Sequence, residues 1–208
     1  INMPPSHNKL ISEISAVQKN TVVVLTNGSA VTMPWIDNVA GVLETWLGGQ
    51  AGAGGIADVL FGKVNPSGKL AETFPMRLED TPAFFNFPGE QGDVLYGERI
   101  FVGYRYYDGR KIEPLFPFGF GLSYTSFEYS DLKLQKKTIG INEKVYVSCK
   151  IKNTSSVDGD EVVQLYIKDL IASFAQPVIA LKGFQRIKLA AGESKEISFT
   201  ITPEMLSI

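Results

Sequence analysis

Residues 96–124 begin with Tyr96-Gly-Glu-Arg-Ile-Phe-Val-Gly-Tyr-Arg-Tyr-Tyr-Asp108 and end with Pro114-Leu-Phe-Pro-Phe-Gly-Phe-Gly-Leu-Ser-Tyr124. This stretch, the aromatic bridge, carries nine aromatic residues and separates two segments of different hydrophobic periodicity. Surface loops are usually small and polar, so a loop of this composition is expected to be buried against something. It either packs between two domains of this chain and holds them together, or lines a site in a larger protein.

The segment before the bridge alternates between strand and helix patterns. The predicted elements are helix 6–19, strand 21–26, helix 34–40, strand 42–47, helix 56–61 and strand 69–74. The first helix is expected to have Ser6 as its N-cap. Its apolar face comprises Leu10, Ile11, Ile14 and Val17. The β-branched run over 21–26 suits a strand buried on both faces. Residues 1–95 are therefore predicted to form a partial α/β sandwich, a mostly parallel sheet with helices.

After the bridge, apolar residues recur at every second position, and residues typical of turns separate these alternating stretches. The predicted strands cover 127–134, 145–151, 163–167, 178–189 (as one strand or two) and 197–201. Short alternating strands are typical of an immunoglobulin- or fibronectin III-like β-sandwich, which has about seven of them. Since only five or six are visible, residues 125–208 are predicted to form such a sandwich truncated at its C-terminus, with the last hairpin expected past Ile208.

Composition argues against several classes of function. The net charge is −2, and no basic stripe indicates nucleic-acid binding. The apolar runs are too short to span a membrane, and no signal peptide is visible. One histidine, His7, and one cysteine, Cys149, argue against a disulfide framework, most zinc sites and a Ser-His-Asp triad. No cofactor or metal is expected: His7 suits a solvated helix start, Cys149 suits a core strand, and any chemistry would rest on carboxylates.

The glycine run offers a nucleotide-binding alternative. Gly52-x-Gly54-x-x-Ala57 matches a phosphate-binding fingerprint between a predicted strand and a predicted helix, with Glu72 further along the chain. Such a site needs backbone N–H groups at a helix N-terminus to point at a pyrophosphate. However, the helix is barely two turns long, the preceding strand is not the first of its domain, and Glu72 lies in mid-strand. Tight turning and close helix–strand packing explain the glycines more simply.

A sugar site is the alternative raised by three charged residues of the bridge, Glu98, Arg105 and Asp108. Such a site needs aromatic rings to stack on a pyranose and a few fixed polar groups to bond its hydroxyls. The competing interpretation is an ion pair between Glu98 and Arg105 within a domain junction. Trp35 and Trp46 are expected in the core rather than on a binding platform.

Several motifs occur in a fixed order along the chain. They are Asn27-Gly-Ser, Met33-Pro-Trp, Gly48-Gly-Gln, Ala57-Asp-Val-Leu-Phe-Gly62, Asn65-Pro-Ser-Gly-Lys-Leu-x-Glu-Thr-Phe-Pro75, Glu98-x-Ile-Phe-Val-Gly-Tyr-Arg-Tyr-Tyr-Asp108 and Pro114-Leu-Phe-Pro-Phe-Gly-x-Gly-Leu-Ser-Tyr124. As a set they closely resemble the C-terminal part of glycoside hydrolase family 3, specifically the bacterial β-glucosidases. The resemblance runs from the second half of the family's α/β sandwich domain through its fibronectin III-like domain. Arg99 departs from it, because the family usually has glycine after the glutamate.

The resemblance implies a retaining double displacement, in which one carboxylate attacks the anomeric carbon and a second serves as acid and base. In relatives the nucleophile is an aspartate of an N-terminal (β/α)8 barrel, and the acid/base is a glutamate shortly before the helix that matches residues 6–19. Neither motif is present here. The chain is thus expected to be a fragment, or one piece of a split or cleaved enzyme, that lacks both catalytic carboxylates.

No catalytic residue is therefore expected within this chain. If the chain did contain the acid/base, Glu98 would be the candidate. Glu98 and Arg105 are otherwise predicted to shape the rim of the substrate site. Were the chain active alone, its carboxylates would have to be sought among Glu72, Glu90, Asp93, Glu98 and Asp108. The expected partners are a β-glucoside, bound through the complete enzyme, and the missing N-terminal barrel portion.

A non-catalytic module for oligomerisation or polysaccharide binding is the alternative function. The aromatic residues of the predicted sandwich strands are scattered singly, which argues against a carbohydrate-binding row; they are Tyr129, Tyr146, Tyr166, Phe184 and Phe199. A half sheet would leave unpaired edges and apolar faces, so association is expected, including a homo-oligomer. Localisation stays open, since one reduced cysteine is compatible with the cytoplasm but many relatives are secreted.

Overall fold

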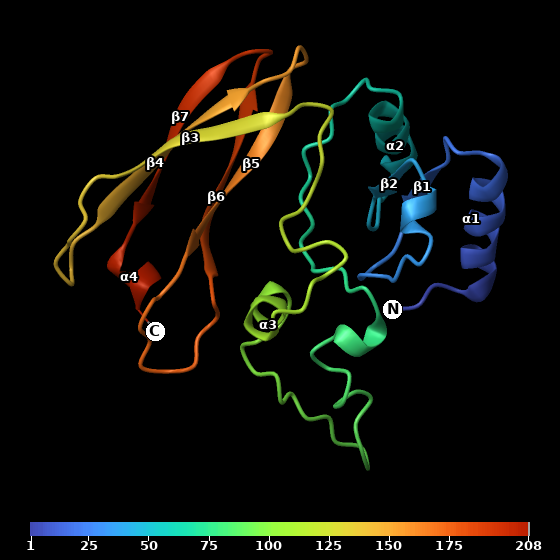
Figure 1. Cartoon of the computed structure of the whole chain (residues 1–208), viewed down its shortest axis with the longest axis horizontal. Helices are drawn as coiled ribbons and strands as arrows, with labels where there is room; N and C mark the ends of the chain where they lie inside the picture. The colour runs from blue at the N-terminus through green and yellow to red at the C-terminus, as the bar shows by residue number, and fades with distance from the viewer. Residues whose placement is uncertain (208) are drawn as a thin grey trace. The chain divides into compact units, whose positions relative to one another are not determined.

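The computed structural model describes residues 1–207, and the chain contains two compact units (Figure 1). The first unit comprises residues 1–61, 70–120 and 172–178. The second unit comprises residues 62–69 and 121–171 together with the chain after residue 178. Helices and a small sheet make up the first unit and antiparallel strands the second, so the predicted order of an α/β part followed by an all-β part is confirmed.

The first unit opens with α1 (Pro5–Val17), which lies beside β1 in Figure 1. The N-cap is Pro4, and no side chain caps the helix, so the prediction of Ser6 as N-cap is wrong. The reason is that Pro5 occupies the first helical position, where its missing N–H is not needed, and Ser6 falls inside the first turn. His7 is exposed in that turn, as predicted.

The apolar face predicted for this helix is only partly buried. Ile11 packs against the core of the first unit. Leu10, Ile14 and Val17 are exposed, because no described segment of this unit covers that side of α1. Periodicity therefore identifies the helix but not which of its apolar residues are buried.

Two short strands, β1 (Val22–Leu25) and β2 (Gly41–Glu44), pair in parallel over their whole length. The pairing confirms two predicted strands, although both are shorter than the ranges 21–26 and 42–47. The expectation that β1 is buried on both faces is wrong, because Val22 and Val24 are exposed. Among the described residues the sheet has these two strands alone, and the face that carries Val23 and Leu25 is the one that packs on the core.

The third predicted strand, over 69–74, does not form. This segment runs antiparallel to residues 116–120 but makes only an isolated bridge, between Phe74 and Phe116. Pro117 lacks an N–H for a ladder, and Gly119 has a φ of 81°, so the opposing segment bends instead of extending.

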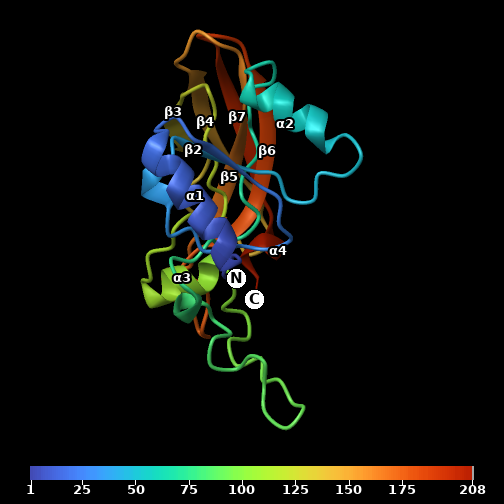
Figure 2. The ribbon, with the colours of Figure 1, turned by 90° about the vertical axis from the view of Figure 1, so that its right-hand side faces the viewer.

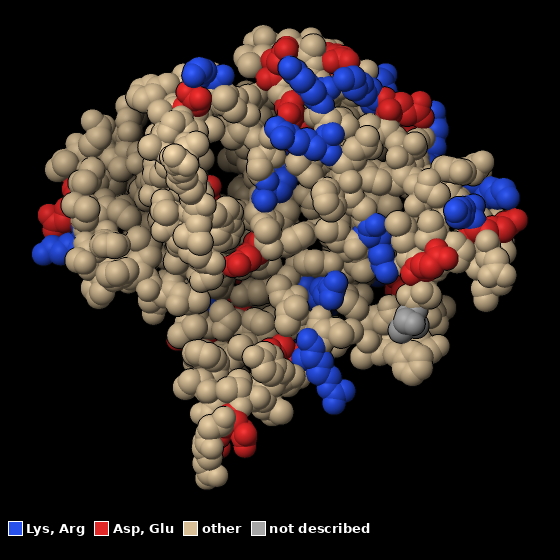
Figure 3. All heavy atoms as spheres, turned by 180° about the vertical axis from the view of Figure 1, so that it is seen from behind, with Lys and Arg blue, Asp and Glu red and all other residues tan. Residues whose placement is uncertain are grey.

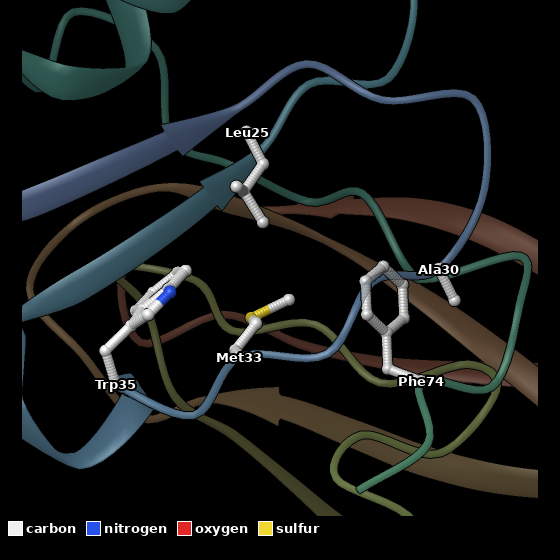
Figure 4. Packing of buried hydrophobic residues seen from close by; sticks show 5 residues of the cluster. All are labelled: Leu25, Ala30, Met33, Trp35 and Phe74. Carbon is white, nitrogen blue, oxygen red and sulfur yellow. The ribbon is translucent and has the colours of Figure 1, made fainter. Parts of the chain in front are cut away.

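The core of the first unit is built mainly from loops, and Figure 4 shows its side chains converging between them. Its buried residues are Leu25, Ala30, Met33, Trp35 and Phe74. Trp35 is 1% exposed and donates its indole N–H to Asn8 Oδ1 at 2.9 Å, so burial leaves its polar end paired. Trp46 packs against this cluster with its ring centroid 5.9 Å from that of Phe74. Both tryptophans therefore belong to the core, as predicted.

Three further elements complete the part before the bridge. α2 (Gly52–Leu60) starts inside the glycine run, earlier than the predicted helix 56–61. The predicted helix 34–40 is reduced to one turn of 3-10 helix, η1 (Ile36–Asn38). A second such turn, η2 (Leu78–Asp80), follows the core residue Phe74.

The aromatic bridge contains a helix that the sequence pattern did not indicate, α3 (Tyr104–Arg110). Tyr107 is only 3% exposed, but Tyr96 and Tyr124 are exposed, so the expectation of a buried bridge holds for its middle and not for its ends. The arm between η2 and α3, green in Figure 2, extends away from the helices and strands of the first unit. Its residue Phe85 is 92% exposed.

The second unit is a β-sandwich. Its elements are β3 (Phe127–Leu134), β4 (Val145–Asn153), β5 (Gly159–Ile167), β6 (Ala180–Leu189), β7 (Ser194–Ile201) and the short helix α4 (Pro203–Leu206). β3, β4 and β7 form one antiparallel sheet, and β5 and β6 form the other. Both sheets contribute to the core, which comprises Ile151, Val163, Ile187, Leu189 and Ile197. Cys149 packs against this core from β4 as a free thiol, as predicted.

Residues 62–69, which we call the clamp segment, are held on the sandwich through the side chain of Asn65. Its Nδ2 donates to Thr125 Oγ1 at 2.7 Å and to Asp158 O at 2.9 Å. Its Oδ1 accepts from Ser123 Oγ at 2.8 Å and from Tyr124 N at 2.9 Å. The amide therefore uses its full hydrogen-bonding capacity, which explains why asparagine stands at this position.

The second anchor of the clamp segment is a buried ion pair. Lys69 Nζ lies 3.1 Å from Glu161 Oε2 and also donates to Gly121 O at 2.9 Å. Glu161 is 8% exposed, and its Oε1 accepts a hydrogen bond from Tyr129 Oη at 2.8 Å. Desolvation and this hydrogen bond raise the pKa of Tyr129, so its hydroxyl remains a donor at neutral pH. Lys69 Nζ and both carboxylate oxygens of Glu161 thus each have an opposite charge or a hydrogen-bond partner beside them.

Charges on the face shown in Figure 3 are mixed, with Lys and Arg side chains interspersed among Asp and Glu. One surface pair is formed by Arg186 and Asp160, whose charged atoms lie 2.7 Å apart. None of the described helices is long and apolar enough to cross a membrane.

Substituting Lys69→Met should destabilise the second unit by about 3 to 5 kcal/mol, because Glu161 would stay buried without its cation. The double variant Lys69→Met/Glu161→Gln should recover part of this loss, since the remaining group is neutral. Lys136→Met, which breaks the exposed pair with Glu143, is the matched control and should leave the urea midpoint almost unchanged. Equal midpoints for Lys69→Met and Lys136→Met would contradict the assignment.

Arg99 has a φ of 52°, in the left-handed region that disfavours side chains with a Cβ atom. Arg99→Gly should therefore raise the free energy of unfolding by about 1 kcal/mol, the strain relief being partly offset by the greater freedom of glycine in the unfolded chain. Thermal denaturation of the full chain measures the effect. Arg99→Ala keeps the Cβ atom and should give no such gain, and an equal gain from both variants would show that the arginine side chain, rather than backbone strain, was responsible.

Candidate functional site

A pocket of about 320 Å³ opens in the first unit next to the core residue Phe74. Two segments that are distant in sequence contribute its main walls. They supply Glu72, Thr73 and Pro75 from the chain before η2, and Tyr104, Tyr107 and Phe118 from the aromatic bridge. No Lys or Arg side chain lines it, and Glu72 is its single carboxylate.

Backbone hydrogen bonds between the two segments set the position of these side chains. Leu70 N donates to Phe120 O at 2.7 Å, and Phe74 N donates to Phe116 O at 2.8 Å. Glu72 and Thr73 lie between these two points and are therefore fixed relative to the bridge. Tyr104 packs against Phe118 with ring centroids 5.1 Å apart, which orients the aromatic wall.

Glu72 is held by one hydrogen bond, which the Ala30 N–H donates to its Oε2 at 3.0 Å. Since Ala30 belongs to the buried core, this contact anchors the carboxylate to the rigid part of the unit. The other oxygen, Oε1, accepts no hydrogen bond from the described residues, and the side chain as a whole is exposed. Glu72 therefore offers a fixed acceptor to a ligand in the pocket.

Two residues that carry a hydroxyl group, Thr73 and Tyr107, line the pocket. Thr73 is 8% exposed, and its Oγ1 is buried without a hydrogen-bond partner among residues 1–207. Burial, with smaller effects of Asp80 and Tyr106, raises the pKa of Tyr107 to about 12, so its hydroxyl is protonated at neutral pH. A buried hydroxyl without a partner is costly, and such groups often mark places where a ligand or water binds.

A second polar group lies where β1 and β2 end, the edge at which open α/β sheets commonly bind ligands. Glu44 accepts from Trp46 N at 2.8 Å and from Asn27 Nδ2 at 3.1 Å. Burial raises the pKa of Glu44 despite these bonds, and the charge of Glu72 adds to the effect. Nowhere in the described chain do three or more His, Cys, Asp or Glu side chains gather to hold a metal ion.

The structure places the three predicted bridge residues outside this pocket. Glu98 is half-buried, and its Oε2 lacks a hydrogen-bond partner within the described chain. Arg105, in α3, lies over the ring of its neighbour Tyr104 at 5.8 Å and makes no ion pair with Glu98 in the part of the chain described. Asp108 is exposed, and partial desolvation raises its pKa. The competing interpretation of a Glu98–Arg105 pair is therefore wrong, because Arg105 lies over Tyr104 instead.

The phosphate-binding alternative receives no support. Gly52, Gly54 and Ala57 all lie within α2, which begins at Gly52, whereas β2 ends at Glu44. The fingerprint needs its glycines in the turn between strand and helix, so that backbone N–H groups can enclose a pyrophosphate. Here the matching residues belong to the helix itself.

Sequence reasoning did not identify Thr73 and Tyr107 as residues of a site. The available signal for Thr73 was a polar residue next to Phe74 in a predicted strand, and that for Tyr107 was its place among the bridge aromatics. Neither signal shows which residues converge, because the two lie in segments that only the tertiary fold brings together. Glu72 was considered in the sequence, but for a different role.

Family models match most of the chain. The glycosyl hydrolase family 3 C-terminal domain covers residues 1–124, and a fibronectin type III-like domain covers residues 161–208. Among curated proteins, thermostable β-glucosidase B of Acetivibrio thermocellus is 56% identical over 97% of this chain and 27% of its own length. β-Glucosidase BoGH3A of Bacteroides ovatus is 45% identical over 98% of this chain and 28% of its own length.

Solved structures of β-glucosidases also match this chain. The family 3 β-glucosidase of Bifidobacterium adolescentis matches with a TM-score of 0.92 and 47% identity, over 98% of this chain and 30% of its own. β-Glucosidase 3B of Thermotoga neapolitana, solved in complex with glucose, matches with a TM-score of 0.90 and 40% identity, over 99% of this chain and 29% of its own. The chain therefore spans less than a third of these relatives. By its family-model match and its relatives, this chain belongs to glycosyl hydrolase family 3, whose C-terminal part it represents.

Proposed function

We propose that this chain acts as the C-terminal portion of a retaining β-glucosidase, which hydrolyses terminal β-D-glucosyl residues from β-glucosides or oligosaccharides. The observation that carries the proposal is the 56% identity to a β-glucosidase along 97% of the chain. An identity of this size, without restriction to a few motifs, favours a shared activity of the complete proteins.

In this proposal the chain supplies scaffold and part of the rim of the substrate site, and the nucleophile and acid/base come from the portion that the relatives carry in addition. The relatives' greater length supports this division. A retaining mechanism needs two carboxyl groups about 5 to 5.5 Å apart on either side of the scissile bond. Glu72, Glu98 and Asp108 are assigned no catalytic role.

Glu98 and Arg105 are proposed for the rim. The buried Glu98 Oε2 has no partner in the described chain, and an unpaired buried carboxylate oxygen costs free energy. A substrate hydroxyl or a group of the complete enzyme that displaces the atoms covering this oxygen would remove that cost. Arg105 is held by stacking on Tyr104, which leaves its guanidinium N–H groups available as donors.

The 208-residue chain alone should not hydrolyse a chromogenic aryl β-glucoside, because it contributes neither reacting carboxylate. Adding the N-terminal portion of a family 3 β-glucosidase, such as the Acetivibrio thermocellus enzyme, should restore turnover. The intact mass of the chain is checked in the same sample, and the N-terminal portion alone serves as the control. Turnover by the chain alone that survives repurification at the expected mass would refute this division of labour.

Glu98→Gln in the restored or fused complete enzyme should raise KM roughly tenfold and change kcat by less than about twofold, as expected for a group that binds ground state and transition state alike. Glu128→Gln, an exposed glutamate of β3, is the matched control and should leave both constants unchanged. A fall in kcat of about a thousandfold, with KM unchanged, would instead identify Glu98 as the acid/base.

A further inference from the structure

We propose that residues 81–103, the arm between η2 and α3, dock onto the N-terminal portion of the complete enzyme through an exposed apolar surface. The surface that receives the arm is apolar, with Lys or Arg side chains at its edge. This inference rests on the proposed function for the existence of that portion. It goes further by assigning the contact to one segment of this chain and by giving the chemistry of the partner surface.

The arm carries a concentration of exposed apolar side chains. Phe85, Phe87, Leu95 and Tyr96 are 92%, 73%, 69% and 76% exposed, and every residue over 88–97 is exposed. Apolar side chains that are scattered singly over a surface need no explanation, but a group of them marks an interaction site. The arm also extends away from the helices and strands of the first unit, so these side chains are accessible to a partner (Figure 2).

The two stretches that carry these side chains lie next to each other and have a defined shape. A Cβ atom on Gly97 would lie 3.1 Å from Asn86 Nδ2, so the two stretches are adjacent. At the tip, Glu90 N donates to Asp93 O at 3.0 Å, and Asp93 N donates to Glu90 O at 2.9 Å. A preformed hairpin loses less conformational entropy on binding than a flexible loop does, which suits a docking element.

The N-terminus of this chain lies at the base of the arm. Ile1 lines the same pocket as Thr81 and Pro82, the first two residues of the arm. Ile1 O also accepts a hydrogen bond from Thr32 N at 3.0 Å, which holds it on the first unit. In the proposed enzyme the N-terminal portion is joined at this point. A portion connected so close to the arm has a high effective concentration there, which favours it as the partner over a separate molecule.

The charge of the arm also favours this partner. The arm contains Glu90, Asp93 and Glu98 but only one basic residue, Arg99, so its net charge is −2. Two arms in contact would bring these carboxylates together, which disfavours a second copy of the chain as the partner. An anionic membrane is disfavoured as well, because apolar segments that bind such membranes carry Lys and Arg. A surface with basic side chains at its edge complements the arm.

Limited proteolysis tests the proposal. A protease specific for glutamyl bonds should cut the 208-residue chain first after Glu90, since exposed loop tips are preferred sites of cleavage. The complete enzyme is obtained by replacing the matching 201 residues of the Acetivibrio thermocellus β-glucosidase B with this chain. Cleavage after Glu90 in this fusion should be at least about tenfold slower, because only the undocked arm enters the protease. Fragment masses identify the cleaved bond.

Phe85→Ser should raise the rate of this cleavage in the fusion at least about fivefold, because it lowers the docked fraction of the arm. In the 208-residue chain the same substitution should change the rate by less than about twofold, since Phe85 is already exposed there. Phe184 of β6 is 72% exposed, and Phe184→Ser is the matched control that should leave both rates unchanged.

Equal rates of cleavage for the 208-residue chain and the folded fusion would overturn the proposal, and so would a Phe85→Ser fusion that stays protected. Protection of the 208-residue chain that grows with its own concentration would also overturn it, by identifying a second copy as the partner. Turnover by a fusion with an unprotected arm contradicts docking alone. A protected arm in a fusion without turnover contradicts the proposed function alone.

Discussion

The buried ion pair between Lys69 and Glu161 is the contact on which the second unit depends. Burying two charges is expensive, and a pair of this kind stabilises only when every remaining polar atom is satisfied. That condition is met here, since Tyr129 donates to the second oxygen of Glu161 and Gly121 O accepts from Lys69. Other alignments of the clamp segment are disfavoured, because a shift would leave a charge buried and unpaired. Its contribution is therefore to specificity as much as to stability.

Close backbone contact makes this alignment possible. A Cβ atom on Gly121 would overlap Gly68 O, and one on Gly159 would lie 2.9 Å from Thr125 Cβ and 3.1 Å from Asn65 Nδ2. Only glycine fits at these two positions, so the clamp segment can approach closely enough for Asn65 to reach all four of its partners. The motif Asn65-Pro-Ser-Gly-Lys69 is thus explained by packing and hydrogen bonding, without any role in chemistry.

Part of the fold follows from the sequence for identifiable reasons. Alternation at Val145, Val147 and Ile151 places these residues on the core face of β4, because a strand with one buried face must alternate. The third strand of the first unit was mispredicted because its failure depends on Pro117, which lies in a different segment. The helix α3 was missed because five of its seven residues, three tyrosines, an aspartate and a glycine, are weak helix formers, and its start needs Gly103 at a φ of 53°.

The candidate site was harder to predict than the fold. Local composition pointed to Glu98 and Arg105, the charged residues nearest the aromatics, yet the pocket combines bridge aromatics with Glu72 and Thr73 from another segment. What brings them together is backbone pairing between residues 70–74 and 116–120, which leaves no periodic signature because it is interrupted after single contacts. A sequence shows which residue types are present, but only the tertiary structure shows which side chains lie close together.

The clamp segment also bears on how such a protein can change over evolutionary time. The β-sandwich starts in sequence after the aromatic bridge, but the unit that contains it includes residues 62–69, which are encoded more than fifty positions earlier. A recombination event at residue 121 would deliver the strands without the lysine and asparagine that hold them, and would leave Glu161 with no counter-charge. The strands of the sandwich therefore cannot be transferred to another protein without the clamp segment. The strands and the clamp segment after α2 have to be inherited together. Substitutions in the clamp segment therefore constrain those in the strands, and the reverse holds too.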